Sequence, residues 1–364
     1  MKNKKLPFPI SGPTAGFTLV EVLLATSIIS IILLFAGQMV SSTSLSVNGS
    51  RKIMDADNLA RMVFDRMNID LSKISQGSTT DIYFNKKEGN DKMYFFSEAP
   101  ASFEPETTGK NTISLIGYQI NTEYETSPHR AGLMRLGKGL SWDSAGSSTT
   151  APMICLTFPA GSFEPDPRST IAGNNQAGAW VGALNDNSTD PDQHLLGAQV
   201  FRFEYYFLLK DGSFSTIPAK KTTSPKSNLE STSPPSPSND NQSDFGAGSR
   251  WWDQSEARGY ICTQATSGLA VWKPLGLDDV SAIVVNLAIL DKGSTEMVGD
   301  MGQLSQVFGD TEESSLRVDP PKLLMEVWND QLTAIIASPP EGIPKILSGK
   351  IQLYQRIFNI NQSH

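Results

Sequence analysis

Residues 16–25 read Gly16-Phe17-Thr18-Leu19-Val20-Glu21-Val22-Leu23-Leu24-Ala25, and they open a long apolar run. From Phe17 to Val40, Glu21 is the only ionisable side chain in 24 residues. A helix of that length spans roughly 36 Å, which is enough to cross a hydrocarbon core of about 30 Å. We therefore predict a membrane-spanning helix over residues 17–40. A carboxylate inside such a helix is costly, and it marks a functional position.

Two simpler interpretations of this run are weaker. A secretory signal peptide has an apolar stretch of only about 7 to 15 residues before a small-residue cleavage site, whereas this run is longer and carries Glu21 near its start. An ordinary single-pass anchor accounts for the length and for the basic residues ahead of it. It gives no reason for Glu21 or for the Gly16-Phe17 pair.

The N-terminal segment as a whole resembles the type IV prepilin class. Residues 1–16 form a short leader with Lys2, Lys4 and Lys5 that ends in Gly16, and Glu21 is the fifth residue after it. The resemblance implies that a prepilin peptidase cuts between Gly16 and Phe17 and methylates the new amine of Phe17. It also implies that Glu21 offsets the N-terminal charge of a neighbouring pilin during assembly. Other pilins or pseudopilins are the partners expected from this class.

The charge balance argues against nucleic acid as a partner. The chain has a formal charge of −8, and removal of the leader takes away three lysines and no acid, which leaves −11. Phosphate binding requires clustered Lys and Arg, so we expect no nucleic-acid function. The basic leader predicts a cytoplasmic N-terminus, an inner-membrane anchor and a periplasmic head. Disulfides persist in that compartment, and Cys155 and Cys262 could form one, although two separately buried thiols would give the same pattern.

An amphipathic helix is predicted over residues 41–75, after the membrane span. Its apolar side chains return every three or four residues, which places them on one helical face. They are Ile53, Ala56, Ala60, Val63, Met67, Leu71 and Ile74.

Residues 76–364 are predicted to form a β-rich head, so the fold class is α+β. Residues 81–84 and 93–96 flank a polar stretch and indicate a hairpin. Residues 200–209 are the clearest strand, with Phe201, Phe203 and the later odd-numbered residues on one face and Arg202 and Glu204 on the other. The remaining predicted strands are 112–120, 130–136, 153–158, 214–218, 279–290 and 351–360, and a helix is predicted over 321–337.

Residues 220–249 differ in composition from the rest of the head. They are rich in Ser, Pro, Asn and Gly and have few large apolar side chains, so we predict a disordered insertion there. Trp251-Trp252 follows at once. This pair is interpreted as a cover for a core, and an exposed interaction patch is the alternative.

Within the prepilin class, the order of segments is similar to the J-type minor pseudopilin of type II secretion. This similarity implies a minor pseudopilin that helps initiate or cap a pseudopilus. The alternative is a minor pilin at the tip of a surface type IV pilus that holds a ligand. The segments that carry the similarity are 117–120, 132–135, 200–209 with the Asp211-Gly212 turn, and 273–275 ahead of 279–290.

No catalytic motif stands out, so we expect no enzyme. The three histidines form no HExxH spacing, and no nucleophile elbow, phosphate loop or CxxC pair is present. We expect no cofactor, with one exception to consider. Residues 185–192 crowd oxygen ligands as calcium loops do, with Asp186, Asp190 and Asp192 as candidates, although the Gly and Glu of an EF-hand loop are missing. A solvated turn explains this segment equally well.

Overall fold

The computed structural model describes residues 16, 18–75, 82–86, 88–100, 113–121, 132–140, 193–255, 257–291, 293–294, 301–340 and 349–360. The chain divides into two compact units, residues 1–52 and 53–364. The division falls within the long helix α1 (Leu19–Ser72).

The first unit contains the apolar part of α1. A stretch of this helix is long and apolar enough to span a membrane, and none of that stretch is buried. Its large side chains, such as Leu23, Ile32 and Phe35, are at least half exposed. An apolar surface of this kind is stable only when lipid or other protein covers it, which agrees with the predicted membrane helix.

In the second unit, the remainder of α1 buries one face. Five of the seven residues predicted for that face are fully buried within the helix, and Ile74 is buried just after it. The prediction was wrong for Ile53, whose side chain is 49% exposed. The five buried helical residues are Ala56, Ala60, Val63, Met67 and Leu71.

The first sheet of the head is antiparallel, in the order β1-β2-β3-β4-β5. The predicted hairpin is present, because β1 pairs with β2 and Phe84 lies opposite Met93. Gly117 in β3 is needed for close packing, since a Cβ there would lie 2.2 Å from the ring of Tyr94. The strands are β1 (Ile82–Asn85), β2 (Lys92–Ser97), β3 (Ile113–Asn121), β4 (Gly132–Leu140) and β5 (Gln193–Gly197).

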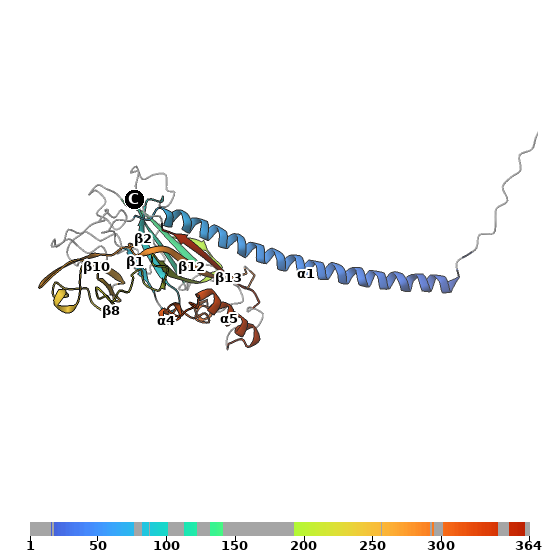
Figure 1. Ribbon diagram of the computed structural model, residues 1–364. Coiled ribbons are helices and arrows are strands. Elements are labelled where there is room, and N and C mark those ends of the chain that lie inside the picture. The colour runs from blue at the N-terminus through green and yellow to red at the C-terminus, as the bar shows by residue number, and fades with distance from the viewer. Residues whose placement is uncertain are drawn as a thin grey trace, which may run out of the picture. The chain divides into compact units, whose positions relative to one another are not determined.

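The central sheet has the order β13-β12-β6-β7 and is covered on both faces. Its strands are β6 (Val200–Leu209), β7 (Phe214–Ser215), β12 (Val280–Leu290) and β13 (Ile351–Asn359). One face packs in the same core as α1 and the first sheet, and the other packs against three helices, α3 (Met301–Ser305), α4 (Glu313–Leu316) and α5 (Leu324–Ala337). Figure 1 shows α4 and α5 on one side of this sheet.

Both faces of β6 are covered. Arg202 and Glu204 lie on the face opposite Phe203, Tyr205 and Phe207, as predicted, and they are 0% exposed because the helical layer covers that face. Phe201 also packs in the helical layer, whereas Phe203, Tyr205 and Phe207 pack on the α1 side. The pairing register shifts between Ala288 and Ile289, opposite the start of β6, so Phe201 leaves the expected alternation.

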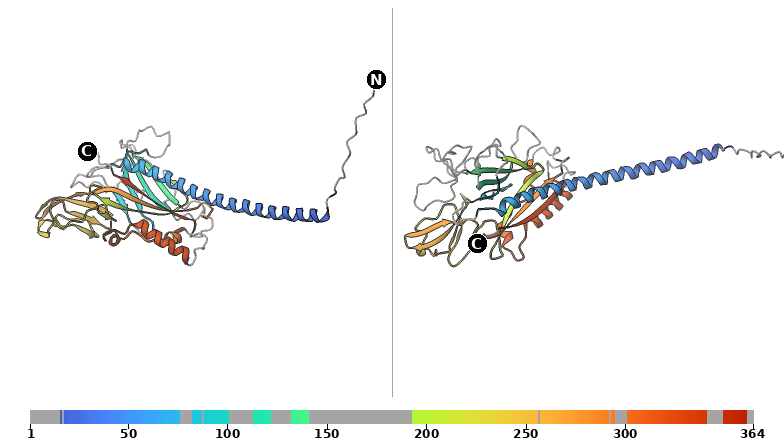
Figure 2. Two further views of the ribbon diagram at one scale, coloured as in Figure 1. Left: turned by 45° about the vertical axis from the view of Figure 1, so that its right-hand side comes forward. Right: turned by 90° about the horizontal axis from the view of Figure 1, so that it is seen from above.

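The prediction that residues 220–249 form a disordered insertion was wrong. Residues 220–249 belong to a lobe whose sheet has the order β11-β10-β9-β8, and Figure 2 shows these strands gathered at one end of the head. The strands are β8 (Asn228–Ser231), β9 (Arg250–Asp253), β10 (Arg258–Thr266) and β11 (Leu269–Pro274), with a short 3-10 helix η2 (Asn241–Ser243).

Aromatic side chains and polar contacts order the insertion despite its composition. The indole N–H of Trp251 donates to the carbonyl of Ser233 at 2.8 Å, and that of Trp272 donates to the carbonyl of Asn239 at 3.2 Å. Phe245 packs against both indole rings, with centroid distances of 5.6 Å. Trp251 and Trp252 are therefore core residues, as the first interpretation of this pair expected.

Asp240 is the residue whose loss should loosen this insertion. Its carboxylate accepts the N–H of Gln242 at 2.9 Å and that of Gly268, in the β10–β11 turn, at 2.5 Å. We expect Asp240→Ala to be cleaved by subtilisin within residues 233–245 under conditions that leave the wild-type lobe intact there. Asp244→Asn is the matched control, because Asp244 is exposed and its φ of 66° suits Asn. Equal cleavage of both variants and the wild type would contradict this role of Asp240.

The long N-terminal helix followed by a head of several antiparallel sheets confirms the predicted α+β class. Most predicted strands lie within two residues of the observed ones. The predicted strand 153–158 lies outside the described residues.

Candidate functional site

The start of α1 is held by a reciprocal pair of hydrogen bonds. Thr18 immediately precedes the helix, and its N–H and hydroxyl donate to Glu21 Oε2 at 2.9 and 3.0 Å. The N–H of Glu21 donates back to Thr18 Oγ1 at 3.3 Å. This is a capping box, in which the residues at the two ends of a Thr-x-x-Glu spacing satisfy each other's free N–H groups. Glu21 therefore starts the helix as well as placing a carboxylate at its apolar end.

Gly16 lies two residues ahead of this box. Among the described residues, no atom lies within 4 Å of the position that a Cβ would take at Gly16. The surrounding structure thus gives no packing reason for a glycine. A requirement for glycine here would come from a molecule that binds the segment. Phe17 lies outside the described residues.

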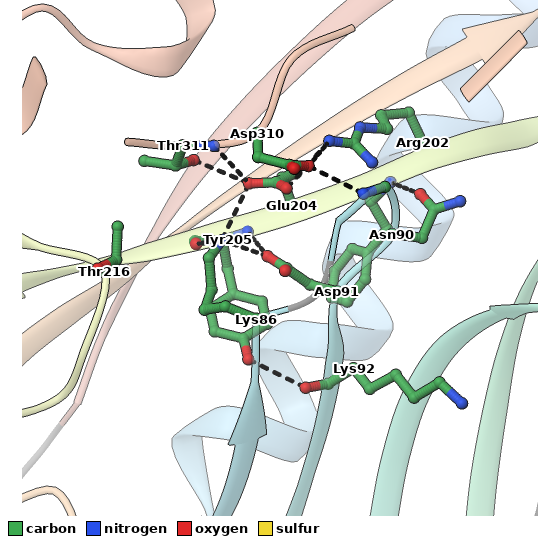
Figure 3. Close-up of polar contacts among 12 residues, drawn as sticks. Lys86, Asn90, Asp91, Lys92, Arg202, Glu204, Tyr205, Thr216, Asp310 and Thr311 are labelled. Atoms are coloured by element: carbon green, nitrogen blue, oxygen red, sulfur yellow. Dashed lines mark hydrogen bonds and ion pairs between the residues drawn. The ribbon is translucent and has the colours of Figure 1, made fainter. Parts of the chain in front are cut away.

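The head contains a second candidate, a buried ionic cluster of Lys86, Asp91, Arg202, Glu204 and Asp310 (Figure 3). Lys86 follows β1, Asp91 precedes β2, and Glu204 lies in β6. The ammonium of Lys86 donates to Asp91, to Glu204 Oε2 at 2.9 Å and to the carbonyl of Tyr205 at 2.6 Å. One ammonium thus joins the β1–β2 loop to β6.

The other half of the ionic cluster joins β6 to the segment after α3. Arg202 donates to Glu204 Oε1 at 3.1 Å and to Asp310. The N–H and hydroxyl of Thr311 donate to Glu204 Oε2 at 3.2 and 2.8 Å, and the N–H of Gly89 donates to Asp310 Oδ1 at 3.0 Å. Three chain segments therefore meet at one set of charges.

Burial and neighbouring charge shift the proton affinities in this cluster. Burial raises the pKa of Asp91 to about 8, and the charge of Glu204 adds to the increase, while the ammonium of Lys86 opposes it. Burial alone would lower the pKa of Lys86, but the carboxylates of Asp91 and Glu204 outweigh it and raise that pKa. Lys86 therefore stays charged at neutral pH, whereas Asp91 gains or loses its proton close to neutral pH.

Sequence reasoning missed most of these residues. Thr18 could have been found, because Thr-x-x-Glu before an apolar run is a sequence signature of a helix start. Arg202 and Glu204 also carried a signal, as charges two residues apart within a strand of aromatic residues. Lys86 and Asp91 carried none, since charges in a hairpin loop usually face water.

Comparison with known proteins bears on the N-terminal site. Residues 13–37 match the family model described as the prokaryotic N-terminal methylation motif. The chain carries this methylation motif. It contains Gly16, the capping box and most of the predicted membrane-spanning helix, so the type IV prepilin leader predicted from the sequence is confirmed.

Comparisons over the whole chain give less information than the N-terminal motif. No curated protein matches it. Among solved structures it is similar to a type IV-like pilin from Thermus thermophilus, with 11% sequence identity and a TM-score of 0.29. The similarity covers 84% of this chain and 94% of that one.

The remaining predicted site residues stay predictions. Cys155, Asp186, Asp190 and Asp192 lie outside the described residues. Cys262 is buried in β10, where its thiol donates to the carbonyl of Gln264 at 3.3 Å, and burial raises its pKa. Within the described ranges, no three His, Cys, Asp or Glu side chains form a group that could hold a metal ion.

Proposed function

We propose that this protein is a minor pseudopilin that helps initiate or cap a pseudopilus in a type II-like secretion system. The observation that carries the proposal is the methylation motif, with Glu21 in a capping box at the start of one apolar helix and a large β-rich head after it. The role is structural rather than catalytic. Its partners are a prepilin peptidase that also methylates, other pseudopilins, and the inner membrane.

In this proposal, the peptidase removes residues 1–16 and methylates the amine of Phe17. The mature amine is a positive charge four residues ahead of Glu21. A carboxylate in an apolar helix is costly in lipid unless an opposite charge lies near it. The amine of a neighbouring subunit would supply that charge, so pairing with Glu21 would set the position of each subunit in the filament.

The assignment as a minor, J-type subunit rests on the head. The segments similar to that group fall on β3, β4, β6 and the end of β11, ahead of β12. The lobe inserted between β7 and β12 adds a further core to the head, beside the two on the faces of the central sheet. We infer that such a bulky head suits a subunit present in few copies at the end of a filament better than one repeated along it.

A second function is a ligand-binding minor pilin at the tip of a surface type IV pilus. The lobe favours it, because Leu269, the first residue after its β10–β11 turn, is 68% exposed. Deletion of the gene separates the two functions. Loss of a secreted protein with surface pili intact supports the pseudopilin, and loss of pili or of adhesion with secretion intact supports the pilin.

Two variants of Glu21 test the assembly role. Glu21→Gln keeps an oxygen for the Thr18 N–H and removes the charge, whereas Glu21→Val removes both. We expect both proteins to insert into the membrane and both to co-purify with partner pilins at least about tenfold less than wild type, as expected for a lost ion pair in lipid worth about 1.4 kcal/mol or more. Co-purification is measured after crosslinking in membranes. Normal recovery of Glu21→Gln would show that helix capping, and not charge, is what assembly requires.

A further inference from the structure

The buried ionic cluster of the head has an uneven charge count. It contains three carboxyl groups, of Asp91, Glu204 and Asp310, and only two cations, Lys86 and Arg202. The side chains of Asp91, Glu204 and Arg202 are 0% exposed. The side chain of Asp310 is 37% exposed, whereas Asp91 and Glu204 are fully buried and share the single ammonium of Lys86. Such an arrangement favours the retention of one proton.

The hydrogen bonds indicate which carboxyl group retains it. Glu204 accepts four hydrogen bonds, from Lys86, from Arg202 and from both donors of Thr311. Asp91 shares the ammonium of Lys86 with Glu204 and accepts the N–H of Tyr205 at 3.1 Å. Asp91 is therefore the group that exchanges a proton, in agreement with the increase in its pKa.

The groups around Asp91 come from five chain segments. Lys86 lies in the same loop, and Lys92 follows Asp91 in β2. Strand β6 contributes Arg202, Glu204 and Tyr205, strand β1 contributes Tyr83, and the segment after α3 contributes Asp310. Burial raises the pKa of Tyr205 well above its usual range, so its phenol stays neutral. Lys86 stays charged near neutral pH, so protonation of Asp91 changes the net charge of the cluster.

We propose that the ionic cluster is a proton-dependent latch that holds the β1–β2 loop and residues 308–311 against β6 more tightly when Asp91 is protonated. The loop side of this latch also includes backbone contacts. The N–H of Asp91 donates to the carbonyl of Phe203 at 3.1 Å, and the N–H of Phe203 donates to Asn90 Oδ1 at 2.9 Å.

The other side of the latch reaches the helical layer. The indole N–H of Trp328 in α5 donates to the carbonyl of Gly309 at 3.0 Å, and the Arg202 guanidinium lies 5.9 Å from the Trp328 ring. A looser segment 308–311 would therefore loosen the contact between α5 and β6. The latch thus makes the outer layer of the head respond to pH.

The direction of the response follows from proton linkage. Asp91 in the folded chain retains a proton that an unfolded aspartate releases near pH 4. Each pH unit between about 5 and 8 then favours the unfolded chain by about tenfold, and the effect ends above about pH 8, where both states are ionised. The head is thus more stable near pH 6 than near pH 8.

The test uses the full-length protein in detergent micelles, unfolded with urea at about pH 6, 7, 8 and 9. Asp91→Asn keeps the shape of the side chain and cannot titrate. We expect the ratio of the wild-type to the Asp91→Asn unfolding constant to rise about tenfold per pH unit from pH 6 to 8 and to level off above. Asp244→Asn, exposed and remote in sequence from the cluster, should show no such change relative to wild type.

A constant ratio from pH 6 to 9 would mean that Asp91 is ionised throughout, and it would overturn the latch. If Asp91→Asn does not fold, amide hydrogen exchange of the wild-type protein tests the latch instead. After correction for intrinsic exchange, we expect peptides that contain residues 86–92 and 308–312 to lose protection between pH 7 and 9, while peptides from β12 keep theirs. Unchanged protection in both of the first two regions would also overturn the proposal.

Discussion

Replacing Gly16 with Val will leave the leader attached, so the membrane fraction will contain a chain that starts at Met1. Wild-type protein should instead start at N-methyl-Phe17. The reason is steric, because a branched side chain blocks access of the peptidase to the backbone at the cut. The same change should not disturb the chain itself, since no described atom lies within 4 Å of the new Cβ. Intact mass of the extracted protein measures both forms, and we expect loss of nearly all cleavage.

The matched control is Gly37→Ala. Gly37 lies in the same helix and, like Gly16, has no described atom within 4 Å of the position that a Cβ would take. Its variant should mature normally. Normal maturation of Gly16→Val would place the peptidase site elsewhere. A wild-type chain that begins at Met1, or beyond Ala36, would indicate a plain anchor or a secretory signal instead of a prepilin.

Sequence was sufficient for the elements whose signal is local. Strand β6 was predicted at its observed bounds, Val200–Leu209, and β12 within one residue, because a run of about ten residues rich in aromatic and β-branched side chains favours a strand. The buried face of α1 followed from its spacing in the same way. The N-terminal motif is also local, which is why Gly16 and Glu21 stand out from the order of residues alone.

Features that depend on distant partners could not be predicted. Residues 220–249 adopt a defined structure because of contacts with Trp251, Trp272 and the turn at Gly268. The composition of the segment itself gives no sign of these partners. Burial of Arg202 and Glu204 depends on helices that begin about one hundred residues later in the chain. Alternation along a strand reports two faces, but it does not report whether water or a second layer covers the polar one.

Asp70→Ala will destabilise the head more than any other single change proposed above. The Asp70 carboxylate, near the end of α1, accepts from Arg135 Nε and Nη2 in β4 at 2.6 and 3.0 Å and from the Tyr118 hydroxyl in β3 at 2.5 Å. It is fully buried, and Arg135 is only 5% exposed. Removal leaves a buried guanidinium without a counter-charge, which costs about 3–5 kcal/mol. Total stabilities are about 5–15 kcal/mol, so much of the protein should unfold in mild urea.

Two further variants separate charge from packing in this contact between α1 and the first sheet. Asp70→Asn keeps an acceptor for Arg135 and Tyr118 and should fall between wild type and Asp70→Ala. Asp55→Ala, on the exposed face of the same helix, should change the free energy of unfolding by no more than about 0.5 kcal/mol. Urea unfolding of the full-length chain in micelles measures all three. If Asp70→Ala lost no more than Asp55→Ala, the apolar residues of α1 alone would hold the helix to the head. The ion pair would then fix only its rotation and register.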